Sequence, residues 1–226
     1  MKLFALDDRG DGAMQVSPQW LAAHQQHMCW RCGMLDRRYG LPDVQVTSPF
    51  KLHAHLWGLY KFQILVMSTQ LAEFIGWDLI HRDLITSRLL HADGSVQDNG
   101  IACWGREVRL LRSYVNAGSK PCEGCSRPLY DGGRRVFICS RSQLTRSLYL
   151  GHSGGLLVTE SIAERLQSPA AKSHFRPKLN LRFTPVDVLP EPIDGYPELP
   201  DAWLTPTSPD DPPMWQNAIP FAAKVA

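Results

Sequence analysis

The sequence has no long run of one charge. Its 226 residues include 24 Lys and Arg against 22 Asp and Glu, which gives a formal net charge of +2 at pH 7. Proteins that bind nucleic acid or an anionic membrane carry basic patches that neutralise phosphate groups. The near-neutral balance therefore argues against nucleic acid and a membrane as partners. It also disfavours an acidic mimic of nucleic acid, which would need a strong negative charge.

The sequence also has no uninterrupted apolar segment of membrane-spanning length. A spanning helix needs about 20 mostly apolar residues in a row, but the most apolar window, residues 56–77, contains Lys61, Gln63, Gln70 and Glu73. We interpret this window as buried protein core.

An export signal is missing as well, because three aspartates follow the first apolar residues before a signal core could form. The chain is therefore expected to be cytoplasmic. In that compartment its six cysteines are expected as reduced thiols or metal ligands rather than as disulfides.

The sequence does contain enough hydrophobic residues, 44% of the chain, to form the core of one sizeable domain. Apolar periodicity predicts a mixture of short strands and helices. Strands are predicted at residues 2–6, 44–46, 50–56, 136–139 and 156–158, and helices at residues 18–27, 71–77 and 162–166. The expected fold is a single mixed α+β domain over residues 1–189, with an antiparallel-rich sheet and a few helices.

Two helix starts have capping signals. Ser17 precedes Pro18, an order that suits an N-cap followed by the first helical position. Thr159 or Ser161 can cap the helix near residue 162, and Ser161 with Glu164 has the spacing of a capping box.

The composition changes toward the C-terminus. From Pro190 to Pro213 proline recurs every few residues, which favours extended backbone over a packed domain. We therefore assign residues 190–226 to a Pro-rich tail. Trp203, Trp215 and Phe221 predict that it docks, either as a strap on the protein's own surface or on a partner, with a flexible tail as the remaining alternative.

Two cysteine pairs are the most informative motif. Cys29 and Cys32 stand in CWRCG, and Cys122 and Cys125 stand in CEGC. Two thiolates separated by two residues can occupy adjacent corners of a tetrahedron, so two such loops complete a four-cysteine zinc site with Zn–S distances of about 2.3 Å. Gly33 would relieve crowding where the first loop folds back. The pattern predicts a structural zinc that clamps two distant segments.

Other interpretations of the cysteines stay open: a redox-active pair, or reduced thiols without a metal. Cys103 and Cys139 lie in apolar runs and are expected to behave as small buried hydrophobic residues. His24 and His27 lie three residues apart just before Cys29, near enough to serve as substitute ligands.

A second motif, Gly151-His152-Ser153-Gly154-Gly155, matches the G-x-S-x-G pattern of a serine hydrolase. That hydrolase fold places an acid and then a histidine after the serine. Here His174 is the only histidine that follows Ser153, and too little chain remains for the strands that carry the other groups. We therefore interpret the motif as a glycine-rich turn before a buried strand and expect no catalytic residues, with a serine hydrolase as the alternative.

The arrangement of motifs resembles the double-CxxCG motif proteins of myxobacteria, several of which are immunity proteins paired with swarming-inhibition toxins. The likeness rests on KLFAL at the start, CWRCG, a distant CEGC followed by Arg127, then FICSRSQL and LLVTESIAERL. It covers about residues 1–190. The second cysteine motif departs from the pattern because Ser126 stands where a glycine is expected.

This resemblance implies a function that composition and spacing do not reveal. It implies an intracellular, non-enzymatic immunity protein that binds and neutralises a cognate toxin, with Cys29, Cys32, Cys122 and Cys125 as zinc ligands. The alternative within the same class is a zinc-stabilised protein that binds some other partner.

Overall fold

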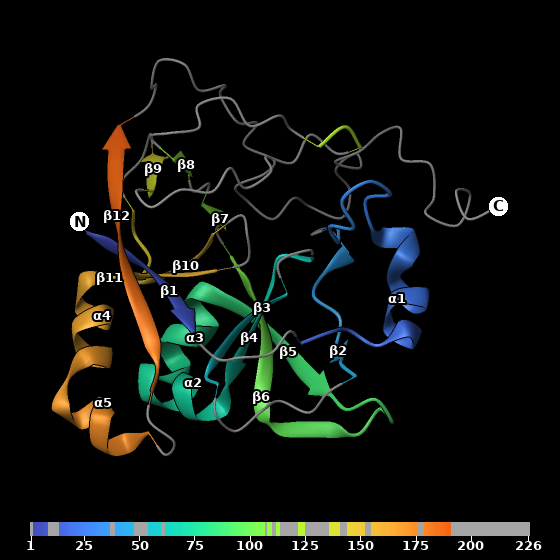
Figure 1. Cartoon of the computed structure of the whole chain (residues 1–226), viewed down its shortest axis with the longest axis horizontal. Coiled ribbons are helices and arrows are strands. Elements are labelled where there is room, and N and C mark those ends of the chain that lie inside the picture. The colour runs from blue at the N-terminus through green and yellow to red at the C-terminus, as the bar shows by residue number, and fades with distance from the viewer. Residues whose placement is uncertain are drawn as a thin grey trace.

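The apolar runs of the sequence form the strands of two β-sheets in the computed structural model (Figure 1). The structure describes residues 2–8, 14–36, 39–47, 54–59, 62–106, 108–109, 112–113, 122–124, 136–140, 144–151, 155–175 and 179–190. Helices and strands mix along this part of the chain, and the two sheets share a core. The fold is therefore a single α+β domain, as predicted, with two sheets where one was expected.

The first sheet has seven strands in the order β7-β10-β11-β1-β12-β9-β8. In chain order their bounds are β1 Leu3–Asp8, β7 Val108–Arg109, β8 Arg112–Ser113, β9 Val136–Ser140, β10 Leu148–Gly151, β11 Leu156–Thr159 and β12 Leu181–Pro190. The N-terminal strand β1 lies in the middle, antiparallel to both β11 and β12. The two ends of the described chain are therefore paired with each other.

The second sheet has five strands in the order β2-β5-β6-β4-β3. Their bounds are β2 Val44–Gln45, β3 Leu56–Leu59, β4 Ile64–Ser68, β5 Leu84–Leu90 and β6 Val96–Gly105. Most pairings in the two sheets are antiparallel; the parallel ones are β7 with β10, β9 with β12 and β2 with β5. The prediction of an antiparallel-rich architecture is confirmed.

Helix α1 (Pro18–His24) starts as predicted and continues as the 3₁₀ turn η1 (Gln25–His27). The Ser17 side chain accepts a hydrogen bond from the backbone N–H of Trp20 at 3.0 Å, and Pro18 occupies the first helical position. The serine satisfies one of the unpaired N–H groups at the start of the helix, and the proline has no N–H group to leave unpaired.

Where one helix was predicted over residues 71–77, the structure has two, α2 (Thr69–Ile75) and α3 (Trp77–Asp83). Gly76 separates them with a φ of +100°, a conformation that side-chain-bearing residues rarely adopt. The apolar period runs through both helices, so periodicity alone did not reveal the break.

Two local predictions are confirmed only in part. The helix near residue 162 is α4 (Glu160–Gln167), and Ser161 lies inside its first turn, so Ser161 and Glu164 form no capping box; Thr159 is the N-cap. The strand predicted at 50–56 instead begins at Leu56, where β3 starts, and residues 50–53 lie outside the described ranges.

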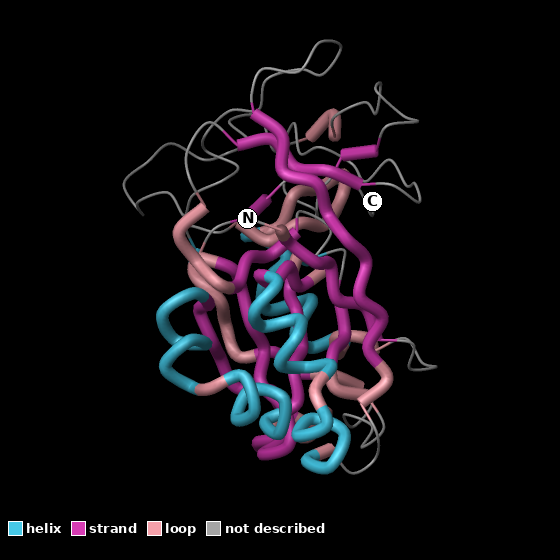
Figure 2. The backbone as a smooth tube through the Cα atoms, turned by 90° about the vertical axis from the view of Figure 1, so that its left-hand side faces the viewer, coloured by secondary structure: helices cyan, strands magenta, loops and turns pink. Residues whose placement is uncertain are grey.

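Alternate residues of the first sheet belong to different apolar clusters. Leu156 and Val158 of β11 join a large cluster that includes residues of both sheets, whereas Leu157 joins a smaller one with Leu3 and Tyr149. Strands buried on both faces read as continuous apolar runs, which explains the sequence LLV. Figure 2 shows most helices lying alongside the strands in the lower half of the molecule. The last of them, α5 (Pro169–His174), follows α4.

A buried carboxylate joins the two sheets. Asp83, at the end of α3, is fully buried and accepts hydrogen bonds from the backbone N–H groups of Ser147 (2.9 Å) and Leu148 (3.1 Å) at the start of β10. Arg82 donates to both carboxylate oxygens, at 2.8 and 2.9 Å. Burial raises the pKa of Asp83, but these hydrogen bonds outweigh burial and hold it below its ordinary value.

Strand β12 ends at Pro190, and the Pro-rich tail predicted over 190–226 otherwise lies outside the described residues. Among the described helices, none has the length and apolar composition that crossing a membrane requires.

The Asp83 junction yields a prediction. Asp83→Asn should lower the free energy of unfolding at pH 7 by about 2–3 kcal/mol, because it removes a buried charge that four donors need. Since folding lowers the Asp83 pKa, its contribution is complete above the unfolded pKa of about 3.9 and is lost as pH falls. Urea unfolding from pH 7 to pH 3 measures both effects. Asp78→Asn, an exposed position on the same helix, is the control; equal losses in both variants would contradict the prediction.

Candidate metal centre

The first cysteine pair lies on a tight loop with a well-defined backbone. Met28 and Leu35 form an antiparallel bridge at its base, and both are buried in the large apolar cluster. The N–H of Cys29 donates to the carbonyl of Met34, and the N–H of Gly33 donates to the carbonyl of Cys29, both at 2.8 Å. Gly33 has a φ of +71°. The predicted role of this glycine, to let the loop fold back, agrees with that conformation.

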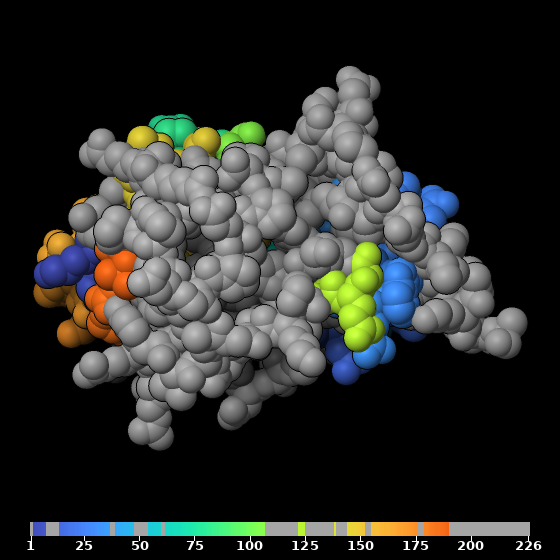
Figure 3. Space-filling model, turned by 90° about the horizontal axis from the view of Figure 1, so that it is seen from above, coloured from blue at the N-terminus to red at the C-terminus, as the bar shows by residue number. Residues whose placement is uncertain are grey.

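The second pair is described in part. Cys122, Glu123 and Gly124 lie within the described chain, whereas Cys125 lies outside it. Figure 3 shows residues 122–124, in yellow-green, on the surface beside N-terminal residues in blue. Two segments far apart in the sequence therefore meet, as the clamp hypothesis requires.

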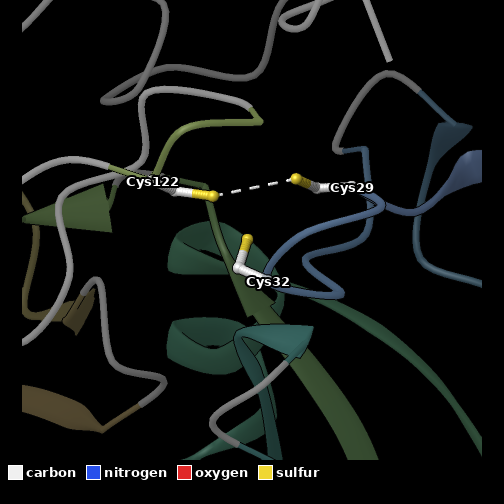
Figure 4. A group of neighbouring side chains, drawn as sticks. All are labelled: Cys29, Cys32 and Cys122. Atoms are coloured by element: carbon white, nitrogen blue, oxygen red, sulfur yellow. Dashed lines mark hydrogen bonds between the residues drawn. The ribbon is translucent and has the colours of Figure 1, made fainter. Parts of the chain in front are cut away.

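Three sulfur atoms converge where these segments meet (Figure 4). The Sγ atoms of Cys29, Cys32 and Cys122 all lie within 4.8 Å of one another, and Cys29 Sγ lies 3.9 Å from Cys122 Sγ. A disulfide would need about 2.05 Å, and none joins the described cysteines. Four sulfurs at about 2.3 Å from a tetrahedral metal are separated by about 3.8 Å. The spacing therefore fits a shared metal ion rather than a covalent bond.

Burial and donor chemistry support the same fit. Cys29 is 0% exposed and Cys122 is 4% exposed, while Cys32 is of intermediate exposure. Thiolates prefer soft or borderline ions such as Zn²⁺. The cysteine cluster can thus hold a metal ion, and within the described residues three of the four predicted ligands stand together.

Gly124 makes the close approach of the two loops possible. A Cβ atom added to it would lie 2.8 Å from Cys29 Sγ, 3.0 Å from Arg31 Cβ and 3.1 Å from Trp30 Nε1. A Cβ atom at 2.8 Å from a sulfur requires one of the two groups to move, and the other two contacts are tight, so glycine suits this close approach of the loops. The sequence motif showed this glycine between two cysteines, but not that it packs against the other pair.

One ion pair also spans the loops. Arg31 Nε lies 3.7 Å from Glu123 Oε2, and the two side chains are 60% and 77% exposed. Exposed pairs of this kind contribute little to stability. The close approach of the sulfur atoms and the packing at Gly124 are therefore the more specific contacts between the described parts of the two segments.

The histidines near the centre have another role. Among the described residues, the group that could hold a metal contains no histidine. His27 stacks on Tyr39 with ring centroids 3.6 Å apart, and His24 Nδ1 lies 3.2 Å from Tyr39 Oη. Partial burial, and secondarily the neighbouring His27, lower the pKa of His24. The spacing of His24 and His27 reflects an aromatic cluster beside the centre.

The remaining cysteines differ. Cys103 is fully buried in strand β6, and burial raises the pKa of its thiol well above the ordinary value. It is the small buried hydrophobic residue that its apolar run predicted. Cys139 lies in β9, where its side chain is not among those described.

The G-x-S-x-G motif lies between the antiparallel strands β10 and β11. Gly151 ends β10, Gly155 directly precedes β11, and the Gly151 N–H donates to the Gly155 carbonyl at 2.7 Å. Ser153 itself lies outside the described residues. A nucleophile elbow joins a strand to a helix, whereas this motif joins two antiparallel strands, of which β11 is fully buried. The buried strand predicted after the motif is confirmed, and the central residues of the predicted turn lie outside the described chain.

Comparison with known proteins adds no relative: no protein-family model matches the chain, and no curated protein does.

The packing at Gly124 can be tested directly. Gly124→Ala should weaken binding of Co²⁺, a spectroscopic substitute for Zn²⁺, by about tenfold or more, because the added methyl group pushes the loops apart. The visible bands of tetrahedral thiolate Co²⁺ measure the affinity.

Gly155→Ala is the matched control, because a Cβ there meets no atom within 4 Å. Unchanged Co²⁺ affinity in Gly124→Ala would show that the two loops are not pressed together as the structure has them.

Proposed function

We propose that this chain is an immunity protein that binds and neutralises a cognate bacterial toxin, and that one structural zinc ion shapes it for that role. Cys29, Cys32, Cys122 and Cys125 are the proposed ligands. The observation that carries the zinc half is the convergence of three sulfurs from segments 93 residues apart.

The chemistry of four thiolates favours a structural role for the metal. A zinc ion with four protein ligands keeps no open position for water or substrate, in contrast to catalytic zinc with three. When bound, such an ion supplies a rigid cross-link. In this chain it would tie the loop of Cys29 and Cys32 to the segment of Cys122 and Cys125. A rigid surface reduces the entropy lost on binding a partner.

The binding half of the proposal rests on the resemblance of the cysteine motifs to the double-CxxCG immunity proteins. The surface near the centre is compatible with it. Tyr39 is 42% exposed, although stacking on His27 fixes its ring, and Arg31 is 60% exposed on the first loop. Tyrosine and arginine are enriched among the residues that carry binding energy. The near-neutral net charge favours binding through such anchors over mimicry of nucleic acid.

A protection assay tests both halves. The chain is co-expressed with candidate bacterial toxins, growth is followed, and zinc in the purified protein is measured. The proposal predicts restored growth, a 1:1 complex with a Kd of about 10⁻⁸ M or tighter, and one zinc per chain. Cys29→Ser and Cys122→Ser should lose the zinc and most of the protection.

Cys103→Ala is the control variant, since it removes a buried cysteine outside the cluster and should keep both zinc and protection. Failure of the parent chain to form a complex would refute the immunity role. Full protection by the zinc-free variants would instead refute the structural role of the metal.

A further inference from the structure

The three sulfurs of the cluster differ in their access to solvent. Cys29 and Cys122 are 0% and 4% exposed, whereas Cys32 is of intermediate exposure. In Figure 4 the Cys29 and Cys122 side chains point toward each other from opposite loops, and Cys32 points toward them from the end of the first loop. A small polar reagent therefore reaches the cluster at Cys32 before it reaches the other two.

We propose that Cys32 is an oxidation site for hydrogen peroxide and that Cys29 resolves it to a disulfide, which opens the clamp. This inference rests on the cysteine centre of the proposed function, and it does not depend on the toxin. Oxidation sensitivity follows thiolate character and exposure. Metal ligation keeps a cysteine deprotonated, so exposure distinguishes the three ligands.

The chemistry balances in two steps. The Cys32 thiolate attacks one peroxide oxygen; an S–O bond forms, the O–O bond breaks, and the departing hydroxide takes a proton to become water. The Cys29 thiolate then attacks the Cys32 sulfur, an S–S bond forms, and the second hydroxide leaves and is protonated to water. In total, two thiols and one peroxide give one disulfide and two waters.

Cys29 is the resolving partner because it is tethered to Cys32. The two residues share one loop, whose ends are held by the Met28–Leu35 bridge and by the hydrogen bond between Cys29 and Met34. Cys29 stays near Cys32 through the short loop itself, whereas Cys122, 90 residues further along the chain, stays near Cys32 only while the two segments remain in contact. The ion pair between Arg31 and Glu123, which also spans the two segments, is exposed and weak.

The consequence is a change in the connection between the two segments. A disulfide between Cys29 and Cys32 removes two ligands at once, so the metal leaves and residues 122–124 lose their link to the first loop. Cys103 is an internal reference, because full burial shields it and raises its thiol pKa. Oxidation should spare it.

The test uses the full chain purified with its metal. Hydrogen peroxide is added at one to ten equivalents, metal release is followed with a chromogenic chelator, and disulfides are mapped by differential alkylation and mass spectrometry. We expect metal release in step with a Cys29–Cys32 disulfide. Cys122 should become alkylated by iodoacetamide in the same proportion, and Cys103 should stay unmodified.

Two variants separate this route from general damage. Cys32→His keeps a metal ligand but removes the thiol, so the rate of peroxide-driven release should fall about tenfold or more. Cys103→Ala removes a buried thiol outside the cluster and should release its metal within about twofold of the parent rate. A first disulfide that includes Cys122, or equal rates for parent and Cys32→His, would overturn the proposal.

The disulfide mapping also distinguishes a failure of this proposal from a failure of the zinc hypothesis. If the purified chain holds no metal, the zinc centre fails. The order of oxidation at Cys32, Cys29 and Cys122 can still be measured on the thiols. Oxidation of Cys29 or Cys122 before Cys32 would then contradict the inference by itself.

Discussion

The convergence of three sulfur atoms is the most specific constraint on how the two cysteine segments are placed. The Sγ atoms of Cys29, Cys32 and Cys122 come together from two segments that no described strand pairing joins. If the three sulfurs are thiolates, their mutual repulsion at less than 5 Å requires a cation between them. Gly124, which leaves room for Cys29, is the matching adaptation of the second segment.

The apolar core and the cysteine centre are separate sources of order. Residues of both sheets share the large apolar cluster, and Asp83 ties α3 to the start of β10, whereas neither Cys29 nor Cys122 belongs to an apolar cluster. If the proposed zinc is bound, its loss should therefore loosen the joined loops more than the sheets. The proposed binding role needs no more than this, since the centre would shape a surface without being required for the whole fold.

Local features of the fold could be predicted from the sequence because their causes are local. The Ser17 cap and the strands β1, β9 and β11 follow from side-chain chemistry and short apolar runs. The division into two sheets could not be predicted, because strand order depends on pairings between distant residues. The break at Gly76 was hidden by an apolar period that continues through it. The spacing of Ser161 and Glu164 predicted a capping box, but the residue with the extended backbone of an N-cap is Thr159.

The candidate site shows the same contrast between local features, which could be predicted, and long-range contacts, which could not. The spacing within each CxxC pair predicted which cysteines share one site, and the sulfur atoms of three of them lie close together in the structure. It could not predict that Gly124 packs on Cys29, because the two residues are distant in sequence. It also could not predict that His27 stacks on Tyr39, because that contact depends on the path of the chain between them. Cys125 and Ser153 lie outside the described residues, so the fourth ligand and the hydrolase alternative stay predictions.

X-ray absorption at the zinc edge on the purified, untagged chain tests the four-cysteine zinc site most directly. We expect one shell of four sulfur atoms at about 2.3 Å and no nitrogen or oxygen ligand. A shell with nitrogen or oxygen in place of sulfur would contradict the four-cysteine clamp, and so would protein that binds no zinc.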